Sequence, residues 1–206
     1  MARVSITDWL LERPLVYRLW QAPFEKAKLT PVLLNADLSS VRKVLDVGCG
    51  PGTNAKCFAH QEYLGIDLNP AYVRFARERF GRRFEIVDVT AVDDAWLADQ
   101  GQFDFILVNS LMHHIDDRAG RRLLESLRSV TAAHGHLHLL ELVRPASWNL
   151  SRVLAHADRG KFARSPSEWQ RLWDGLFEPV VEKQFFLRAC GLKLWSMIYL
   201  KGRPVP

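Results

Sequence analysis

Short apolar runs alternate with amphipathic stretches between residues 41 and 145, and this pattern constrains the fold more than any other feature. A run of four to eight apolar residues fits a strand that is buried on both faces. An amphipathic stretch between two such runs fits a helix that covers the sheet, so the alternation predicts a parallel α/β sheet. The predicted strands are Val41–Val47, Tyr63–Ile66, Phe84–Val87, Phe103–Val108 and Leu137–Leu142.

Signals for helix starts fall between these runs. Asn69 followed by Pro70 is typical of an N-cap and the first helical position. A second helix is expected to begin at Asp116 or Asp117, because apolar residues then recur at helical spacing from Leu123 onward.

Two segments lie outside the alternation, at 1–40 and 146–177. The first is expected to form short helices, and the second a helical insertion in which a capping box at Ser165 starts one helix. The prolines expected to interrupt the N-terminal helices are Pro14, Pro23 and Pro31. After the insertion, an antiparallel strand pair is predicted at Val180–Leu187 and Leu192–Leu200.

The composition excludes several classes of protein. A net charge of +5 is mild for a dedicated nucleic-acid module, so nucleic acid is an unlikely partner. Three cysteines without a CxxC spacing favour neither a disulfide scaffold nor a cysteine-built zinc site. No apolar run approaches the ~18 residues of a membrane span, and charges interrupt the first twenty residues. We therefore expect a cytoplasmic protein without a membrane span; nothing in the sequence indicates its oligomeric state.

A glycine-rich turn follows the first predicted strand. Gly48, Gly50 and Gly52 stand at alternate positions. Glycine lets the backbone turn sharply and approach a ligand so closely that a Cβ would collide with it. A helix is expected to follow, and its free N–H groups would face a negative group.

Two carboxylates follow the next two strands. Asp67 comes 19 residues after Gly48, where a carboxylate can accept hydrogen bonds from both ribose hydroxyls. Asp88 follows the third strand, where it can accept from an adenine amino group. Together with the glycine turn, they predict a nucleoside-binding site.

The glycine spacing separates two cofactors that fit such a site. A dinucleotide fingerprint needs a glycine where Thr53 stands, to pack the helix beside a pyrophosphate. This chain has its third glycine at Gly52 and opens with Asp46, whose carboxylate suits the ammonium of an amino-acid-bearing nucleoside. The loop amides are then expected to face the carboxylate of that ligand.

These residues resemble the class I S-adenosylmethionine-dependent methyltransferases, in particular the small-molecule branch. The resemblance rests on Asp46-Val47-Gly48-Cys49-Gly50-Pro51-Gly52, Tyr63-Leu64-Gly65-Ile66-Asp67, Asp88-Val89, and Phe103-Asp104-Phe105-Ile106 leading to Asn109-Ser110-Leu111-Met112-His113-His114. It implies a Rossmann-like doubly wound sheet of seven strands, mostly parallel with the last strand antiparallel, and a helical cap. It also implies S-adenosylmethionine as cofactor.

The same resemblance implies a set of cofactor-binding residues. Asp67 is expected on the ribose, Asp88 on the adenine amino group, and the glycine loop around the methionine moiety. The full expected set is Asp46, Gly48, Gly50, Gly52, Asn54, Asp67, Leu68, Asp88, Val89, Asn109 and Tyr17. Tyr17 would cover the methionine end of the cofactor, although core packing explains it equally well.

His113 and His114 are the candidate catalytic residues. They follow the fourth strand at the edge where open α/β sheets bind ligands, and histidine titrates near working pH. On an extended loop the two rings would point in opposite directions, so one would face the pocket and the other would be structural. The resemblance favours His114 as the pocket-facing ring. The alternative is that neither is catalytic and the rings position the loop or pack under the adenosine.

Glu141 and Arg144 end the fifth strand on the ligand side, where they are candidates for orienting a polar substrate group. Helix packing or a surface ion pair is the alternative for both. Four residues make the insertion basic: Arg152, Arg159, Lys161 and Arg164. They are expected either to bind an anionic substrate at the rim of the site or to lie on the solvent-exposed side of the insertion helices.

No metal site is expected. His134, His136 and His138 alternate on one strand face, but no carboxylate alternates with them. A histidine on a buried strand usually has a hydrogen-bond partner instead of a metal.

The sequence thus predicts a methyltransferase that acts by in-line displacement on a small, partly apolar molecule. An RNA or protein methyltransferase, or a non-catalytic S-adenosylmethionine-binding module, are the alternatives. We expect a single methyltransferase domain over 1–206, with an N-terminal helical cap at 1–40, a cofactor-binding core at 41–145, a helical lid insertion at 146–177 and a C-terminal strand pair at 178–206.

Overall fold

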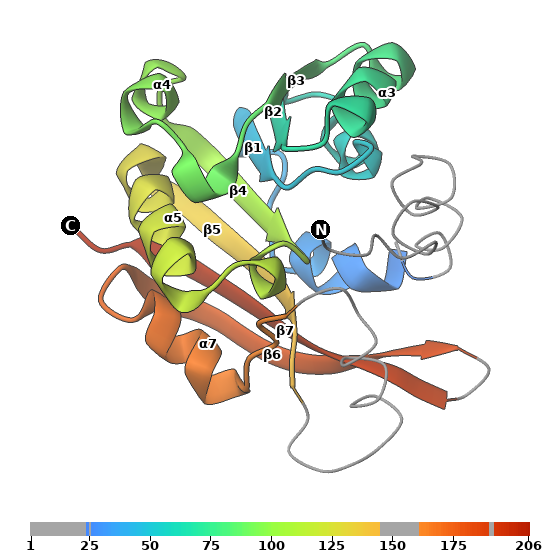
Figure 1. Ribbon diagram of the computed structural model, residues 1–206, viewed down its shortest axis with the longest axis vertical. Helices are drawn as coiled ribbons and strands as arrows, with labels where there is room; N and C mark the ends of the chain where they lie inside the picture. Colours follow the sequence, from blue (N-terminus) through green and yellow to red (C-terminus); the bar gives the residue numbers. More distant parts are fainter. Residues whose placement is uncertain (1–23, 25, 145–160, 190–191) are drawn as a thin grey trace, which may run out of the picture.

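A computed structural model describes residues 24, 26–144, 161–189 and 192–206 (Figure 1). Residues 26–34 are helical. The elements that follow are β1 (Lys43–Val47), η1 (Thr53–Phe58), β2 (Glu62–Asp67), α3 (Pro70–Phe80), β3 (Arg83–Ile86), η2 (Val89–Ala91), α4 (Asp94–Asp99), β4 (Phe103–Asn109), η3 (Met112–His114), α5 (Asp117–Val130), β5 (Thr131–Leu142), α7 (Pro166–Trp173), β6 (Phe177–Ala189) and β7 (Leu192–Pro204).

The strands form one seven-stranded sheet in the order β3-β2-β1-β4-β5-β7-β6. Neighbours from β3 to β5 pair in parallel, whereas β7 runs antiparallel to both β5 and β6. This arrangement confirms the predicted doubly wound sheet with an antiparallel last strand. All five predicted core strands and the C-terminal strand pair are present, with ends shifted by a few residues and an earlier start of β5.

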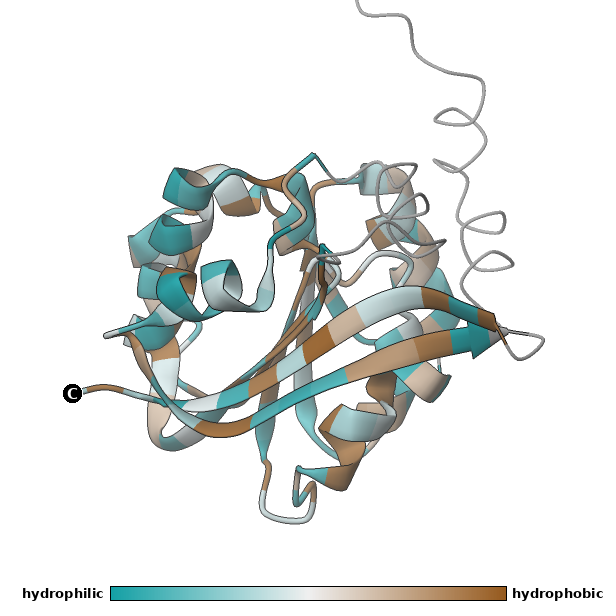
Figure 2. Cartoon of the chain, turned by 90° about the horizontal axis from the view of Figure 1, so that it is seen from below, coloured by the Kyte–Doolittle hydropathy of each residue, from teal (hydrophilic) through white to brown (hydrophobic). Residues whose placement is uncertain are grey.

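Helices cover both faces of the sheet, and each face has its own core (Figure 1). On one face α4, α5 and α7 pack against the strands. On the other face α3, η1 and the helix at 26–34 do so. Side chains alternate between the two cores along β4: Phe105 and Leu107 face one, and Ile106 and Val108 face the other. Figure 2 shows hydrophobic segments along the strands and mainly hydrophilic outer sides on the helices.

The predicted helix starts are confirmed. The Asn69 side chain accepts hydrogen bonds from the N–H groups of Ala71 and Tyr72 at the start of α3. Asp116 caps α5, and Ser165 forms the expected capping box with Glu168 at the start of α7.

The helix expected after the glycine turn is a six-residue 3-10 helix, η1. One local prediction is wrong. The helix at 26–34 continues through Pro31, although an interior proline costs about 3 kcal/mol. Burial of Leu29 and Val32 offsets that cost, and the Asn35 side chain caps the Pro31 carbonyl at 2.8 Å. The expected breaks at Pro14 and Pro23, like most of the lid insertion, lie outside the described residues.

Among the helices that the structure describes, none is long and apolar enough to cross a membrane.

Candidate active site

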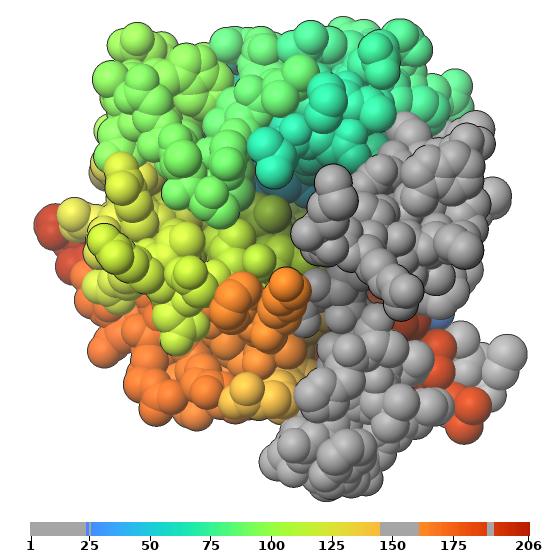
Figure 3. All heavy atoms as spheres, viewed as in Figure 1, coloured from blue at the N-terminus to red at the C-terminus, as the bar shows by residue number. Residues whose placement is uncertain are grey.

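The predicted site residues that the structure describes lie at or next to the carboxyl ends of the parallel strands. The strand order reverses between β1 and β4, and open α/β sheets bind ligands at such a switch point. On the face in Figure 3, blue and olive-green atoms of the β1 and β4 region are set back between the teal β2–α3 region and the yellow-green η3–α5 region. The glycine loop and the η3 turn are adjacent here, because a Cβ on Gly48 would lie 2.9 Å from the Leu111 side chain.

The glycine loop requires glycine at its alternate positions. Gly48, Gly50 and Gly52 have φ angles of 70°, 54° and 77°, in the left-handed region. A Cβ on Gly52 would also lie 2.8 Å from Ala76 Cβ in α3. Both the backbone conformation and the packing therefore exclude larger side chains.

The described amides of this loop donate to acceptors within the protein, so they are not the unpaired donors expected from the sequence. The N–H groups of Gly48 and Cys49 donate to the Ile66 carbonyl at 2.8 and 3.0 Å. Gly50 N–H donates to Asp67 Oδ2 at 2.8 Å, and Gly52 N–H donates to the Cys49 carbonyl at 3.0 Å. The bonds from Gly48, Cys49 and Gly50 hold the loop against the end of β2, and the bond from Gly52 closes a turn within the loop.

Asp67 joins the loop to the start of α3. Its second oxygen accepts from the Asn69 N–H at 2.8 Å, and burial raises the pKa of its carboxyl despite the N–H donors of Asn69 and Gly50. A carboxylate oxygen accepts two hydrogen bonds, so both oxygens retain capacity for a ligand hydroxyl. The neighbouring Leu68 is 62% exposed, which leaves an apolar side chain uncovered beside this carboxylate.

Asp88 lies at the end of β3 and is exposed. Its Oδ1 accepts from the N–H and the hydroxyl of Thr90 at 2.9 and 2.7 Å and so caps η2. The adjacent Val89 is buried.

Asp46 is fully buried in a polar network that the sequence did not reveal. Its Oδ2 accepts from the Tyr63 hydroxyl at 2.7 Å and from the Asn54 amide at 3.1 Å. Burial raises the pKa of Asp46 to about 6, although these hydrogen bonds oppose the shift. A tyrosine inside the apolar run of β2 was the available signal, because a buried hydroxyl needs a partner.

His113 and Glu141 form a buried pair at the end of β4 and β5. His113 Nδ1 lies 2.7 Å from Glu141 Oε2, and the two side chains are 3% and 0% exposed. Glu141 Oε1 accepts from the N–H groups of Leu111 and Met112, each at 2.7 Å. Burial raises the pKa of Glu141, but His113 and these donors outweigh it and hold the pKa below its usual value.

His114 is exposed, unlike His113. The assumed extended loop is wrong, because Met112–His114 form a turn of 3-10 helix and the two rings lie side by side with centroids 4.1 Å apart. Asn109 ends β4, and Ser110 has a φ of 55°, which places the chain reversal directly before this turn.

The two candidate substrate residues differ. The Glu141 side chain is buried, and its described hydrogen-bond partners are Leu111, Met112 and His113, so it matches neither helix packing nor a surface ion pair. Arg144 forms an exposed ion pair with Glu168 at 2.7 Å. Tyr17, Arg152 and Arg159 lie outside the described residues.

Each histidine of the β5 row has a protein partner. His134 Nε2 lies 2.7 Å from Asp104 Oδ1, and His138 Nδ1 lies 2.9 Å from the Tyr199 hydroxyl. His136 Nε2 accepts from Arg203 at 3.4 Å. Burial lowers the pKa of His138, and burial together with neighbouring cations lowers that of His136 to about 4.

Comparison with known proteins identifies the family. A model described as a methyltransferase domain matches residues 44–135. A ubiquinone biosynthesis O-methyltransferase of Acinetobacter baylyi is 25% identical over 171 residues, which cover 80% of this chain and 68% of that protein. An uncharacterized methyltransferase of Mycobacterium bovis is 30% identical over 140 residues, which cover 61% of this chain and 68% of that one. Several further relatives are longer, and the chain spans about half their length.

A solved structure shares the whole fold. An S-adenosylmethionine-dependent methyltransferase of Anabaena variabilis superposes with a TM-score of 0.70 at 16% identity, over 98% of this chain and 96% of that one. The chain therefore belongs to the class I S-adenosylmethionine-dependent methyltransferases, whose cofactor is S-adenosylmethionine. Two features of the site fit that cofactor. The glycine loop leaves no room for a Cβ, and the Asp67 carboxylate, beside the exposed Leu68, can accept further hydrogen bonds.

Proposed function

We propose that this protein transfers a methyl group from S-adenosylmethionine to a small, partly apolar molecule, and that His114 assists the transfer. The observation that carries the proposal is the exposed His114 on a turn that Glu141 holds and that packs against the glycine loop through Leu111. This turn lies next to the loop expected to surround the methionine moiety, and His114 is its exposed imidazole.

The expected cofactor-binding residues divide by moiety. Asp67 would accept the ribose hydroxyls, and Leu68, Asp88 and Val89 would surround the adenine. The residues proposed around the methionine moiety are Asp46, Gly48, Gly50, Gly52, Asn54, Asn109 and Tyr17. When bound, S-adenosylmethionine would supply the methyl group of its sulfonium: the nucleophile would bond to the methyl carbon as the bond from that carbon to sulfur breaks, and S-adenosylhomocysteine would be the leaving group.

Much of the rate enhancement in such a reaction comes from holding the nucleophile close and in line, in a site that excludes water. His114 would accept a proton from the nucleophile at its imidazole when that nucleophile is a hydroxyl or an acidic carbon. His113 cannot serve this purpose directly, because its ring is buried against Glu141. We assign it to positioning.

The substrate class rests on two arguments. The relative from Acinetobacter acts in ubiquinone biosynthesis, and so on a small molecule. The net charge of +5 gives little support to an RNA acceptor.

Two measurements test the proposal. Calorimetric titration with S-adenosylmethionine, S-adenosylhomocysteine and NAD should show binding of the first two and none of NAD. A radiolabelled-methyl survey of small hydroxyl, amine, thiol and carbon-acid acceptors, RNA and protein should then label a small molecule. Label confined to RNA or protein would overturn the substrate class, and cofactor binding without transfer to any acceptor would favour a binding module.

A further inference from the structure

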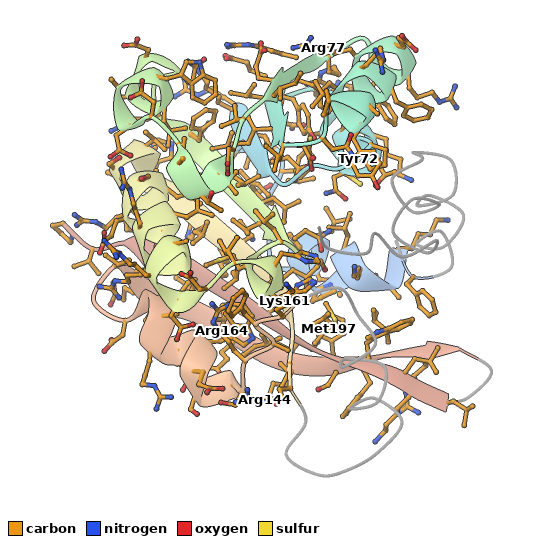
Figure 4. The ribbon with its side chains drawn as sticks, in the orientation of Figure 1. Tyr72, Arg77, Arg144, Lys161, Arg164 and Met197 are labelled. Carbon is orange, nitrogen blue, oxygen red and sulfur yellow. The ribbon has the colours of Figure 1, made fainter. Side chains whose placement is uncertain are left out.

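Arg164 is a buried cation that the sequence placed on an exposed rim. Its side chain is 5% exposed and lies between α5 and α7 (Figure 4). Its Nη1 and Nη2 donate to the carbonyls of Met112 and Ile115, each at 2.8 Å. Its Nε donates to Asp117 Oδ1 at 2.7 Å, and the guanidinium lies 4.7 Å from the Trp169 ring centroid.

The η3 turn is therefore held from both ends by buried charges. Glu141 accepts hydrogen bonds from the N–H groups of Leu111 and Met112, where the chain enters the turn. Arg164 donates to the carbonyl of Met112, the first residue of the turn, and to the carbonyl of Ile115, the residue after the turn. Each charge faces the end of the turn whose peptide groups carry the opposite partial charge. The two residues come from elements that are far from the turn in sequence, β5 and the segment before α7.

The segment that contains Arg164 is also tied to the turn by its backbone. Phe162 N–H donates to the His113 carbonyl at 2.9 Å, and Arg144 N–H donates to the Arg164 carbonyl at 2.8 Å. The carbonyls of Met112, His113 and Ile115 therefore all accept hydrogen bonds from residues 162–164. Burying the charges of Glu141 and Arg164 costs free energy, and on an exposed turn water could bind the same carbonyls. What the buried charges add is a fixed position of the turn.

We propose that Arg164 is a positioning residue for methyl transfer, which fixes His114 relative to the glycine loop by holding the carbonyls on either side of it. This inference rests on the proposed role of His114. Arginine is suited to the task because its planar fork binds two acceptors in fixed geometry, whereas lysine is a point charge. A misplacement of about 1 Å in a catalytic group can cost about 100-fold in rate.

The principal test is a double-mutant cycle on the full chain, assayed with the acceptor that the methyl survey identifies. Arg164→Lys should lower kcat by about 100-fold and change the Kd of S-adenosylhomocysteine less than about threefold. In a His114→Ala background, Arg164→Lys should lower kcat no further, because the ring that it positions is gone. Arg121→Gln is the matched control: Arg121 donates to the carbonyls of Leu172 and Asp174, away from the turn, and its loss should leave kcat unchanged.

A second variant covers the case in which Arg164→Lys fails to fold. Asp117 is 81% exposed, so Asp117→Ala removes the partner of Arg164 Nε without creating a buried cavity. It should lower kcat severalfold. It should also speed hydrogen exchange of the Leu111 and Met112 amides in the cofactor-free protein, a measurement that needs no substrate.

The outcomes separate the two proposals. Near-normal kcat for His114→Ala overturns the role of His114, and with it the positioning role of Arg164. A large effect of His114→Ala combined with an additive effect of Arg164→Lys overturns only the positioning role. Unchanged kcat and amide exchange in Asp117→Ala would contradict it as well.

Discussion

Two histidine–carboxylate pairs stand at opposite edges of the same sheet. At the carboxyl edge, His113 Nδ1 lies 2.7 Å from Glu141 Oε2, and at the amino edge His134 Nε2 lies 2.7 Å from Asp104 Oδ1. Each carboxylate also binds two successive backbone N–H groups. Glu141 accepts from the residues that enter the η3 turn, and Asp104 accepts from Arg42 and Lys43 at the start of β1.

The two pairs differ in burial. The His113 side chain is 3% exposed and that of Glu141 is 0%, whereas His134 is 66% and Asp104 10% exposed. An exposed pair contributes less than about 1 kcal/mol, but a buried carboxylate that loses its partner costs several. The two pairs have the same distance but contribute differently to stability, and of these two pairs only the buried one can hold the η3 turn rigidly.

The largest expected effect is on turnover at the carboxyl edge. His114→Ala should lower kcat by about 10² to 10⁴ while cofactor affinity changes little, because general-base loss has that size. His134→Ala removes the same type of side chain at the amino edge and should leave kcat unchanged. Steady-state kinetics and calorimetry on both variants check this, and equal kcat values for the two would remove histidine from the mechanism.

The difference in burial predicts a difference in stability. His113→Ala should lower the free energy of unfolding by about 3–5 kcal/mol, because it leaves Glu141 buried without its ring partner. His134→Ala should lower it by less than about 1 kcal/mol. Urea unfolding at pH 7 measures both values, and similar losses would show that burial does not distinguish the pairs.

A third prediction compares two aspartates whose pKa shifts have opposite signs. Burial raises the pKa of Asp46 from 3.8 to about 6. The folded state thus binds a proton more tightly than the unfolded state, and its stabilisation is lost as pH rises through 6. Asp46→Asn cannot ionise, so the free energy of unfolding of the cofactor-free variant, relative to wild type, should rise by about 2 kcal/mol between pH 4 and pH 8.

Asp104 provides the control of opposite sign. Burial raises its pKa, but the N–H groups of Arg42 and Lys43 and the His134 ring outweigh burial and hold the pKa below 3.8. Its stabilisation is therefore present above that pH, and Asp104→Asn should be less stable than wild type at pH 8. Unfolding curves at pH 4, 6 and 8 measure both variants; a stability difference for Asp46→Asn that does not change with pH would contradict the assignment.

The smallest expected effect concerns cofactor affinity. Asp67→Ala should weaken S-adenosylmethionine binding by about 1.5–3 kcal/mol, or roughly 10- to 150-fold, the usual size of charged hydrogen bonds. Asp104→Ala at the amino edge should leave affinity unchanged. Calorimetry is the measurement, and unchanged affinity in a folded Asp67→Ala protein would show that Asp67 does not bind the ribose.

Local patterns determined the strands, helix starts and glycine turn in this protein. Apolar runs report strands directly, and Asn69, Asp116 and Ser165 cap helices through contacts with residues two or three positions away. Left-handed glycines are likewise a local backbone property. The family resemblance added the number of strands, the doubly wound arrangement and the antiparallel last strand.

Tertiary structure decided which side chains are buried and what they bind. Glu141 meets His113 across 28 residues, and Arg164 meets Met112 across 52, so no local spacing reports either contact. The acceptors of the loop amides are likewise set by tertiary structure, because the N–H groups of Gly48, Cys49 and Gly50 donate to the end of β2. The sequence placed polar residues at the correct edge of the sheet. Their separation into exposed and buried groups depends on how β5 and α7 pack against the turn, because burial is a property of the assembled chain.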